Sequence, residues 1–163
     1  LVVSGLIGLV SDEVMASSSL PVAFGILLFI VLLGIVFDII GMAVASADEK
    51  PFHSMAARKV PGAQEAIRLL RNAERVSSIC NDVVGDICGV VSGSAGAALT
   101  MRIGEKMGLS STFVVGILVA AFIAAFTVGG KAIGKRLAIK RSKDILMLTG
   151  CAAAFLSGLF KRK

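Results

Sequence analysis

The sequence has no Trp, no Tyr and a single His, and it carries few charged residues. Only 17% of its 163 residues are Asp, Glu, Lys or Arg, against about a quarter in a typical soluble domain. The apolar residues, 56% of the chain, fall into uninterrupted runs, and the mean hydropathy is +0.89. Such runs are typical of segments solvated by lipid. The composition excludes an ordinary soluble domain and predicts an all-α integral membrane protein.

Side chains that commonly carry chemistry are scarce. Cys80, Cys88 and Cys151 show no CxxC or Cys/His spacing, so we expect reduced thiols packed like small hydrophobes. The single His53 is better explained as a surface residue than as a ligand. No Ser/His/Asp set, phosphate-binding loop or pair of catalytic acids on a soluble scaffold is present. We therefore expect that the protein is not an enzyme.

Three segments are long and apolar enough to span a membrane, at about 20–47, 76–101 and 107–130. Residues 1–19 begin with an apolar stretch, which we interpret as the remnant of an N-terminal hydrophobic segment and an outer loop. The apolar run 145–160 is shorter than the roughly 20 residues of a span, and cations bracket it. We expect a cytoplasmic juxtamembrane helix at 144–160, with a fourth crossing as the alternative.

Basic residues predict the orientation of the spans. The chain has 17 Lys and Arg against 11 Asp and Glu. The basic residues lie beside the apolar runs, six of them in 48–75 and six in 131–143. Because no aromatic residues are interleaved with them, the positive-inside rule explains this charge better than nucleic-acid binding does. We expect both segments and the C-terminus to be cytoplasmic, and 11–20 and 102–106 to face outward.

The cytoplasmic connection contains a predicted amphipathic helix at 61–75. Its apolar face comprises Ala66, Ile67, Leu70 and Ala73, opposite Arg68, Arg71 and Arg75. We expect this juxtamembrane helix to lie on the membrane surface.

Three acids interrupt the spans, where an ionisable group is costly and needs a partner, a proton or an ion. Asp38, Asp82 and Asp86 are all predicted about 10 to 17 Å from the cytoplasmic edge, at 1.5 Å of helix per residue. Asp82 and Asp86 are four apart and share a helical face, with Asn81 and Gly85 on the adjacent ridge. Carboxylate, amide and backbone oxygens suit a hard cation such as Mg²⁺. The alternative is that the acids are protonated, or hydrogen-bond between helices to Ser77, Ser78, Ser92 or Thr127.

Small residues recur every four positions in the second span, at Gly85, Gly89, Gly93 and Ala97. This spacing allows helix backbones to approach closely. Glycines also occur where a transporter helix unwinds to offer carbonyl oxygens, so the pattern fits both interpretations.

Four segments resemble a known family in their order and spacing. They are 37–46 (Phe-Asp-Ile-Ile-Gly-Met-Ala-Val-Ala-Ser), 71–75 (Arg-Asn-Ala-Glu-Arg), 79–85 (Ile-Cys-Asn-Asp-Val-Val-Gly) and 127–138 (Thr-Val-Gly-Gly-Lys-Ala-Ile-Gly-Lys-Arg-Leu-Ala). Over residues 20–160 the chain resembles the transmembrane domain of the CNNM/CorC magnesium and cobalt transporters. In that family three of these elements read Phe-Ser-x-Ser-Glu-Thr-Ala-Leu, Ile-Gly-Asn-Asn-Leu-Val-Asn and Gly-Glu-Ile-Leu-Pro-Lys-Ser-Leu-Ala.

The chain also departs from the family pattern. Asn81, Lys135, Leu137 and Ala138 match the family residues. Asp38 stands where the family has a serine, Asp82 where it has an asparagine, Gly41 and Lys131 where it has glutamates, and Gly134 where it has a proline. The cytosolic CBS domains that usually follow in family members are not in this sequence. The substitutions make the predicted ion site more anionic than that of the family.

The resemblance implies a divalent-cation transporter, with Mg²⁺ as the expected ion and efflux as the expected direction. The expected ligands are Asp38, Asn81, Asp82, Asp86 and Gly85, lining an acidic cavity in the inner half of the membrane. The resemblance also implies a homodimer in a bacterial inner membrane. The alternative is a non-transporting scaffold or regulatory protein with a degenerate ion site.

Overall fold

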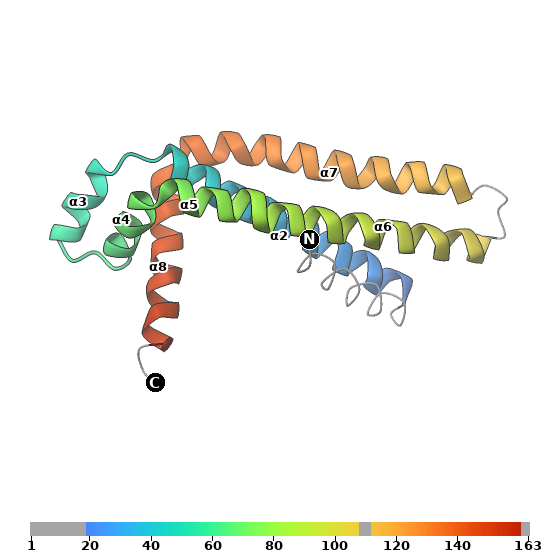
Figure 1. Cartoon of the computed structure of the whole chain (residues 1–163), viewed down its shortest axis with the longest axis horizontal. Helices are drawn as coiled ribbons and strands as arrows, with labels where there is room; N and C mark the ends of the chain where they lie inside the picture. The colour runs from blue at the N-terminus through green and yellow to red at the C-terminus, as the bar shows by residue number, and fades with distance from the viewer. Residues whose placement is uncertain (1–18, 108–111, 161–163) are drawn as a thin grey trace. The chain divides into compact units, whose positions relative to one another are not determined.

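The computed structural model describes residues 19–107 and 112–160, which are helical almost throughout (Figure 1). The helices are α2 (Leu20–Ser46), α3 (Lys50–Ala57), α4 (Ala63–Arg71), α5 (Ala73–Ser78), the π-helix η1 (Ile79–Val84), α6 (Gly85–Met107), α7 (Thr112–Lys140) and α8 (Ser142–Phe160). No strand occurs in the described ranges, so the all-α prediction is confirmed for them. The predicted N-terminal hydrophobic remnant lies, except for its last residue, outside the described residues.

Three helical stretches are long and apolar enough to cross a membrane: Leu20–Ser46, Ala73–Glu105 and Phe113–Lys140. They overlap the three predicted spans, and two of the helices continue beyond the predicted ends. The connection expected at 102–106 is helical, because it has no proline and contains the helix formers Arg, Glu and Lys. The basic segment after Gly130 is helical too, since α7 continues through residues of good helix propensity to Lys140.

Helix α3 was not predicted from the sequence. It begins at Lys50, and Pro51 occupies its first turn, where the missing N–H costs nothing and the fixed φ favours helix. Phe52, the next residue, is 1% exposed. The connection between α2 and the predicted amphipathic helix therefore contains a short helix, which places one aromatic side chain in a core.

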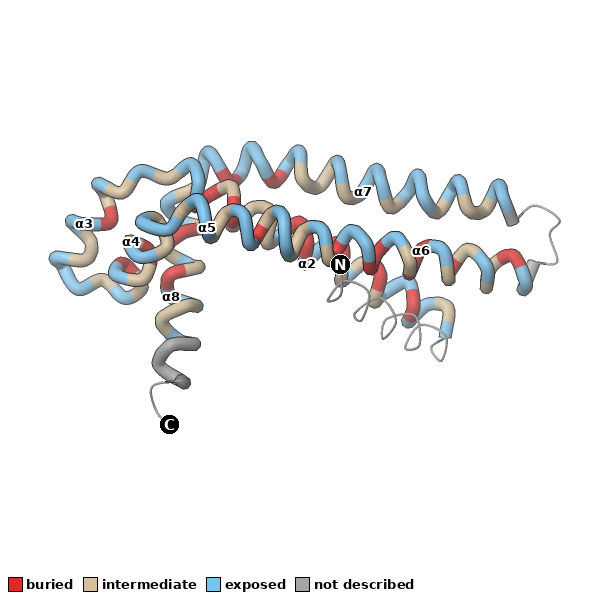
Figure 2. The backbone as a smooth tube through the Cα atoms, viewed as in Figure 1, coloured by how far each residue is buried: buried red, intermediate tan, exposed pale blue. Residues whose placement is uncertain are grey.

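The chain divides into two compact units. Unit 1 contains residues 1–36 and 84–132, and its described part comprises most of α2, α6 and the apolar part of α7. Its core is formed by two stripes at four-residue spacing: Ala23, Leu27 and Val31 on α2, and Val91, Ala95 and Leu99 on α6. From 113 to 132, no residue of α7 is buried (Figure 2). This long apolar surface is what a helix solvated by lipid exposes.

Glycines set how closely the helices of unit 1 approach. A Cβ on Gly34 of α2 would lie 3.0 Å from Cβ of Cys88, and one on Gly96 would lie 2.5 Å from Cδ1 of Ile123 on α7. By contrast, a Cβ on Gly89 or Gly93 would meet no atom within 4 Å. The close approach expected at those two glycines is therefore not made by the described residues, and α6 contacts α7 through Gly96 instead.

Unit 2 contains residues 37–83 and 133–163, and α4 lies at its centre, packed against both α3 and α8 (Figure 1). Its core is built on four buried side chains, Val44, Phe52, Ala66 and Leu146. Ile67 and Leu70 of α4 pack against this core. Because this face packs on protein within unit 2, less of it is available to a membrane than the sequence suggests, and the expected placement of α4 on a membrane surface stays a prediction.

Candidate functional site

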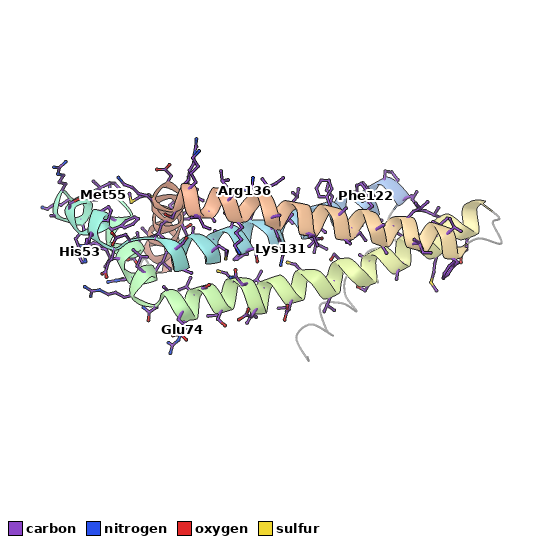
Figure 3. All side chains as sticks on the ribbon, turned by 90° about the horizontal axis from the view of Figure 1, so that it is seen from above. His53, Met55, Glu74, Phe122, Lys131 and Arg136 are labelled. Carbon is purple, nitrogen blue, oxygen red and sulfur yellow. The ribbon has the colours of Figure 1, made fainter. Side chains whose placement is uncertain are left out.

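Unit 1 contains a cavity of about 400 Å³ between its three helices. The lining residues are Val31, Gly34 and Ile35 of α2, residues Gly85, Asp86, Cys88, Gly89, Val90 and Ser92 of α6, and Thr127 and Lys131 of α7. Most of the lining is apolar, but a carboxylate and an ammonium group, from Asp86 and Lys131, border the same space. Lys131 is labelled on α7 in Figure 3.

Local packing explains why the helices bring these residues together. Gly34 lets α2 approach α6 at Cys88, and a Cβ on Gly130 would collide with the Ile35 side chain. These two glycines therefore hold α2 close to both α6 and α7 beside the cavity. A Cβ on Gly89 would meet no atom within 4 Å, so Gly89 leaves one wall of the cavity open.

Two hydroxyl groups line the cavity besides the charged side chains. Ser92 Oγ donates to the Gly89 carbonyl at 3.0 Å, and Thr127 Oγ1 donates to the Ile123 carbonyl at 2.7 Å. Each hydroxyl uses its proton within its own helix, and its oxygen lone pairs remain able to accept a proton or contact a cation. The interhelical hydrogen bonds considered for these hydroxyls are therefore not their described interactions.

In unit 2, Asn81 lies in the π-helix η1, an arrangement that occurs frequently at functional sites. Its Nδ2 donates to Ser77 Oγ at 3.3 Å, while its Oδ1 is buried and has no hydrogen-bond partner among the described residues. Leaving a buried acceptor unpaired costs about 1–3 kcal/mol. A Cβ on Gly41 of α2 would collide with this Oδ1, so the glycine makes room for the amide.

The other two predicted ligands of unit 2 have different surroundings. Asp82 is exposed, and its Oδ2 accepts a hydrogen bond of 2.6 Å from Ser78 Oγ, one turn earlier. Asp38 is half-buried on α2 and makes a polar interaction of its own. Asp86, which is also exposed, and the half-buried Gly85 border the cavity of unit 1. The five predicted ligands are thus divided between the two units.

Acidic residues do not accumulate as densely as the sequence suggested. Across the two described ranges, no three side chains among His, Cys, Asp and Glu gather closely enough to hold a metal ion. Any cation site here would use fewer than three acidic side chains. The assignment of the five residues to one ion site stays a prediction, now with at most two carboxylates at the ion.

The three cysteines and the histidine are either buried thiols or surface residues. Cys80 and Cys88 are buried free thiols, as predicted, whereas Cys151 is exposed. His53 is on the surface, also as predicted, and its Nε2 lies 3.1 Å from Glu49 Oε1. Arg71 Nε donates to the same oxygen at 3.3 Å. This group is a surface network and offers no ligand site.

No protein-family model matches the chain, and no curated protein or solved structure matches it significantly. The family resemblance therefore rests on the quoted segments alone, and the site rests on its geometry.

The sequence did not predict which residues line the cavity. The sequence suggests Ser92 and Thr127 only as groups that hydrogen-bond between helices, and it suggests Lys131 only as a residue of the basic cytoplasmic segment 131–143. One signal was present for Lys131, because it follows an uncharged run of more than 20 residues and so begins on the apolar part of its helix. The unpaired Asn81 oxygen had no sequence signal.

Proposed function

We propose that the protein transports a divalent cation, with Mg²⁺ as the ion and efflux as the direction, through the cavity of unit 1. One observation carries the proposal: the carboxylate of Asp86 borders a space of about 400 Å³ among helices that are apolar enough to span a membrane. An ionisable side chain at such a position marks an ion or substrate pathway by default.

The size of the cavity supports a hydrated ion. Mg²⁺ has octahedral coordination and usually keeps several waters, binding through one or two carboxylates. Six waters of about 30 Å³ each occupy roughly 180 Å³, so the cavity is large enough for the ion with its hydration shell. A three-carboxylate cage is therefore not required.

Lys131 places a positive charge in the same cavity as the carboxylate of Asp86. Both charged groups border the same mostly apolar cavity, so the ammonium offsets part of the cost of an ionised carboxylate when no cation is bound. When a cation enters, the same ammonium repels it and weakens binding. Transport needs a site that binds well enough to admit the ion and weakly enough to release it.

Asn81 supplies the second part of the proposal. Its buried, unpaired Oδ1 is a preformed oxygen ligand in unit 2, and Asp38 and Asp82 belong to the same unit. In this proposal the cation exchanges waters for these oxygens at one stage of its passage and for Asp86 and the Gly85 carbonyl at another. A homodimer in a bacterial inner membrane, with a cytoplasmic C-terminus, completes the proposed arrangement.

Flux measurements test the proposal directly. The full chain is reconstituted in liposomes that contain a Mg²⁺-sensitive dye, and Asp86→Asn is compared with Glu105→Gln, an exposed acid near the end of α6 outside the cavity. We expect flux above that of empty vesicles, most of it lost in Asp86→Asn and retained in Glu105→Gln. Equal flux in the two variants would refute the cavity as the pathway.

The alternative function is a non-transporting membrane scaffold or regulatory protein with a degenerate ion site. It is favoured by the placement of a cation, Lys131, in the same cavity as Asp86. The flux measurement separates the two functions, because a scaffold gives no transport above empty vesicles while its helices remain folded by circular dichroism.

A further inference from the structure

Helix α8 has two apolar faces, and the described residues of unit 2 cover only one of them. Leu146 is fully buried, and a Cβ on Gly150 would lie 2.5 Å from the Gly62 carbonyl oxygen at the start of α4. On the other face, Leu148 is 76% exposed and Phe155 is 72% exposed. Ala152 is exposed between them, whereas the Cys151 thiol donates to the Pro61 carbonyl oxygen at 3.3 Å and so belongs to the contact with the start of α4.

Leu148, Ala152 and Phe155 form one exposed apolar surface. They stand at positions i, i+4 and i+7, which share a helix face. At 100° per residue, the centre of this face lies about 170° around the helix from the midpoint of Leu146 and Gly150. The apolar surface of Leu148, Ala152 and Phe155, here the outer face of α8, is thus opposite the side that packs on α4.

The side of α4 that faces away from its buried alanines is charged rather than apolar. Ala63 and Ala66 are fully buried, whereas the side chains of Arg68 and Arg71 are 73% and 66% exposed. Arg68 Nη1 lies 2.9 Å from Glu65 Oε1 on the same surface. Together α4 and α8 therefore form a two-helix layer that is charged on the α4 side and apolar on the α8 side.

The charge around the outer face identifies what covers it. Arg141 and Lys143 precede this face along the chain, and Lys161, Arg162 and Lys163 follow it. An apolar helical face between two basic clusters is the composition of a helix that lies in the interface of a membrane with anionic lipids. The basic ends attract the headgroups, and the apolar face enters the acyl-chain boundary.

The packing of α4 also argues against α8 as a crossing helix. If α8 crossed the bilayer, the helix packed along it would carry Arg68, Arg71 and Glu65 into the hydrocarbon, where exposed charges are costly. With the layer flat on the membrane, the same charged side chains lie in water.

We propose that the α4–α8 layer docks flat on an anionic lipid surface, with the outer face of α8 in the acyl-chain boundary and the arginines of α4 on the aqueous side. This placement differs from the one that the amphipathic pattern of α4 alone suggested. It does not depend on the transport proposal, because it concerns unit 2 alone and holds equally for a scaffold.

Depth measurements on the full 163-residue chain test the docking. Cys151→Ala leaves the two buried cysteines, and a single fluorophore is then placed through Leu148→Cys, Phe155→Cys or, as the control on the charged side, Arg68→Cys. All three positions are exposed, so the labels should not disturb the core. The protein is reconstituted in phosphatidylcholine vesicles with and without phosphatidylglycerol.

In vesicles with phosphatidylglycerol, we expect nitroxides near the top of the acyl chains to quench the labels at 148 and 155 several-fold more than an aqueous quencher does. The label at 68 should show the reverse, and omission of phosphatidylglycerol should at least halve the protection at 148 and 155. Strong aqueous quenching at all three positions in both lipids would overturn the docking. Quenching by bilayer-centre nitroxides at 155 would show a crossing helix instead, and protection from both quenchers would show a protein partner on this face; either result also overturns the proposal.

Discussion

Replacing Gly150 by Ala offers a sharp test of the packing between α4 and α8. The new Cβ would lie 2.5 Å from the Gly62 carbonyl oxygen and 3.1 Å from the Ala66 backbone nitrogen. Both obstacles are backbone atoms, so the clash is relieved only by moving α4 away from α8. Overpacking of this kind costs about 1–3 kcal/mol.

The matched control is Gly93→Ala on α6, where a Cβ meets no atom within 4 Å. Both glycines lie inside helices, so each substitution gains about 0.5–1 kcal/mol of helix propensity. This gain cancels in the comparison, and the stability difference between the two variants equals the cost of the clash, about 1–3 kcal/mol. We expect Gly150→Ala to be the less stable variant by this amount.

The stabilities are measured by denaturant titration of the full chain in mild detergent micelles, followed by far-ultraviolet circular dichroism. Since the chain has no Trp or Tyr, backbone dichroism is the natural signal. If Gly150→Ala were as stable as Gly93→Ala, the close contact between α8 and the start of α4 would not exist, and the two-helix layer would lose its basis.

Three further predictions use the same unfolding measurement. Gly96→Ala should cost less than Gly150→Ala, because its Cβ meets only the flexible end of the Ile123 side chain; an equal or larger cost would contradict this. Phe52→Ala, which empties a fully buried position in unit 2, should destabilise by about 3–5 kcal/mol, and a loss below 1 kcal/mol would show that Phe52 is not in a core. Asn81→Leu should leave stability in metal-free buffer unchanged, or raise it by about 1 kcal/mol, because it removes an unpaired buried oxygen. The same variant should lose any stabilisation by millimolar Mg²⁺ that the parent protein shows, and a retained Mg²⁺ response would exclude Asn81 as a ligand.

The spans could be predicted because their signal is local. Residues 20–46 form an apolar run that is too long for an ordinary core helix, and length and composition alone identify it. The run does not indicate which side of α2 packs against its neighbours, because α2 is apolar on all sides. The rotation of each helix about its axis, which decides whether an acid faces a cavity or a neighbour, is therefore set by contacts such as Gly34 with Cys88 and Gly130 with Ile35.

The same limit explains the difference at the predicted acidic cluster. Spacing placed Asp82 and Asp86 on one face of a regular α-helix, but the residues from Ile79 to Val84 form a π-helix, which shifts the phase of the helix between them. Asp86 then borders the cavity of unit 1, while Asp82 binds Ser78. Nothing in the local propensities of these residues marks the change of helix type.

The amphipathic helices of unit 2 show a second kind of ambiguity. The sequence pattern, with Ala66, Ile67 and Leu70 opposite arginines, is the same whether lipid or another helix covers the apolar residues. The apolar run of α8 supplies the cover, because it is long enough to provide Leu146 for one side and Leu148 and Phe155 for the other. Once α8 takes the apolar face of α4, the exposed apolar surface passes from α4 to α8, and the arginines of α4 mark the side that faces water. The pairing of the two helices therefore decides which of them can touch the membrane.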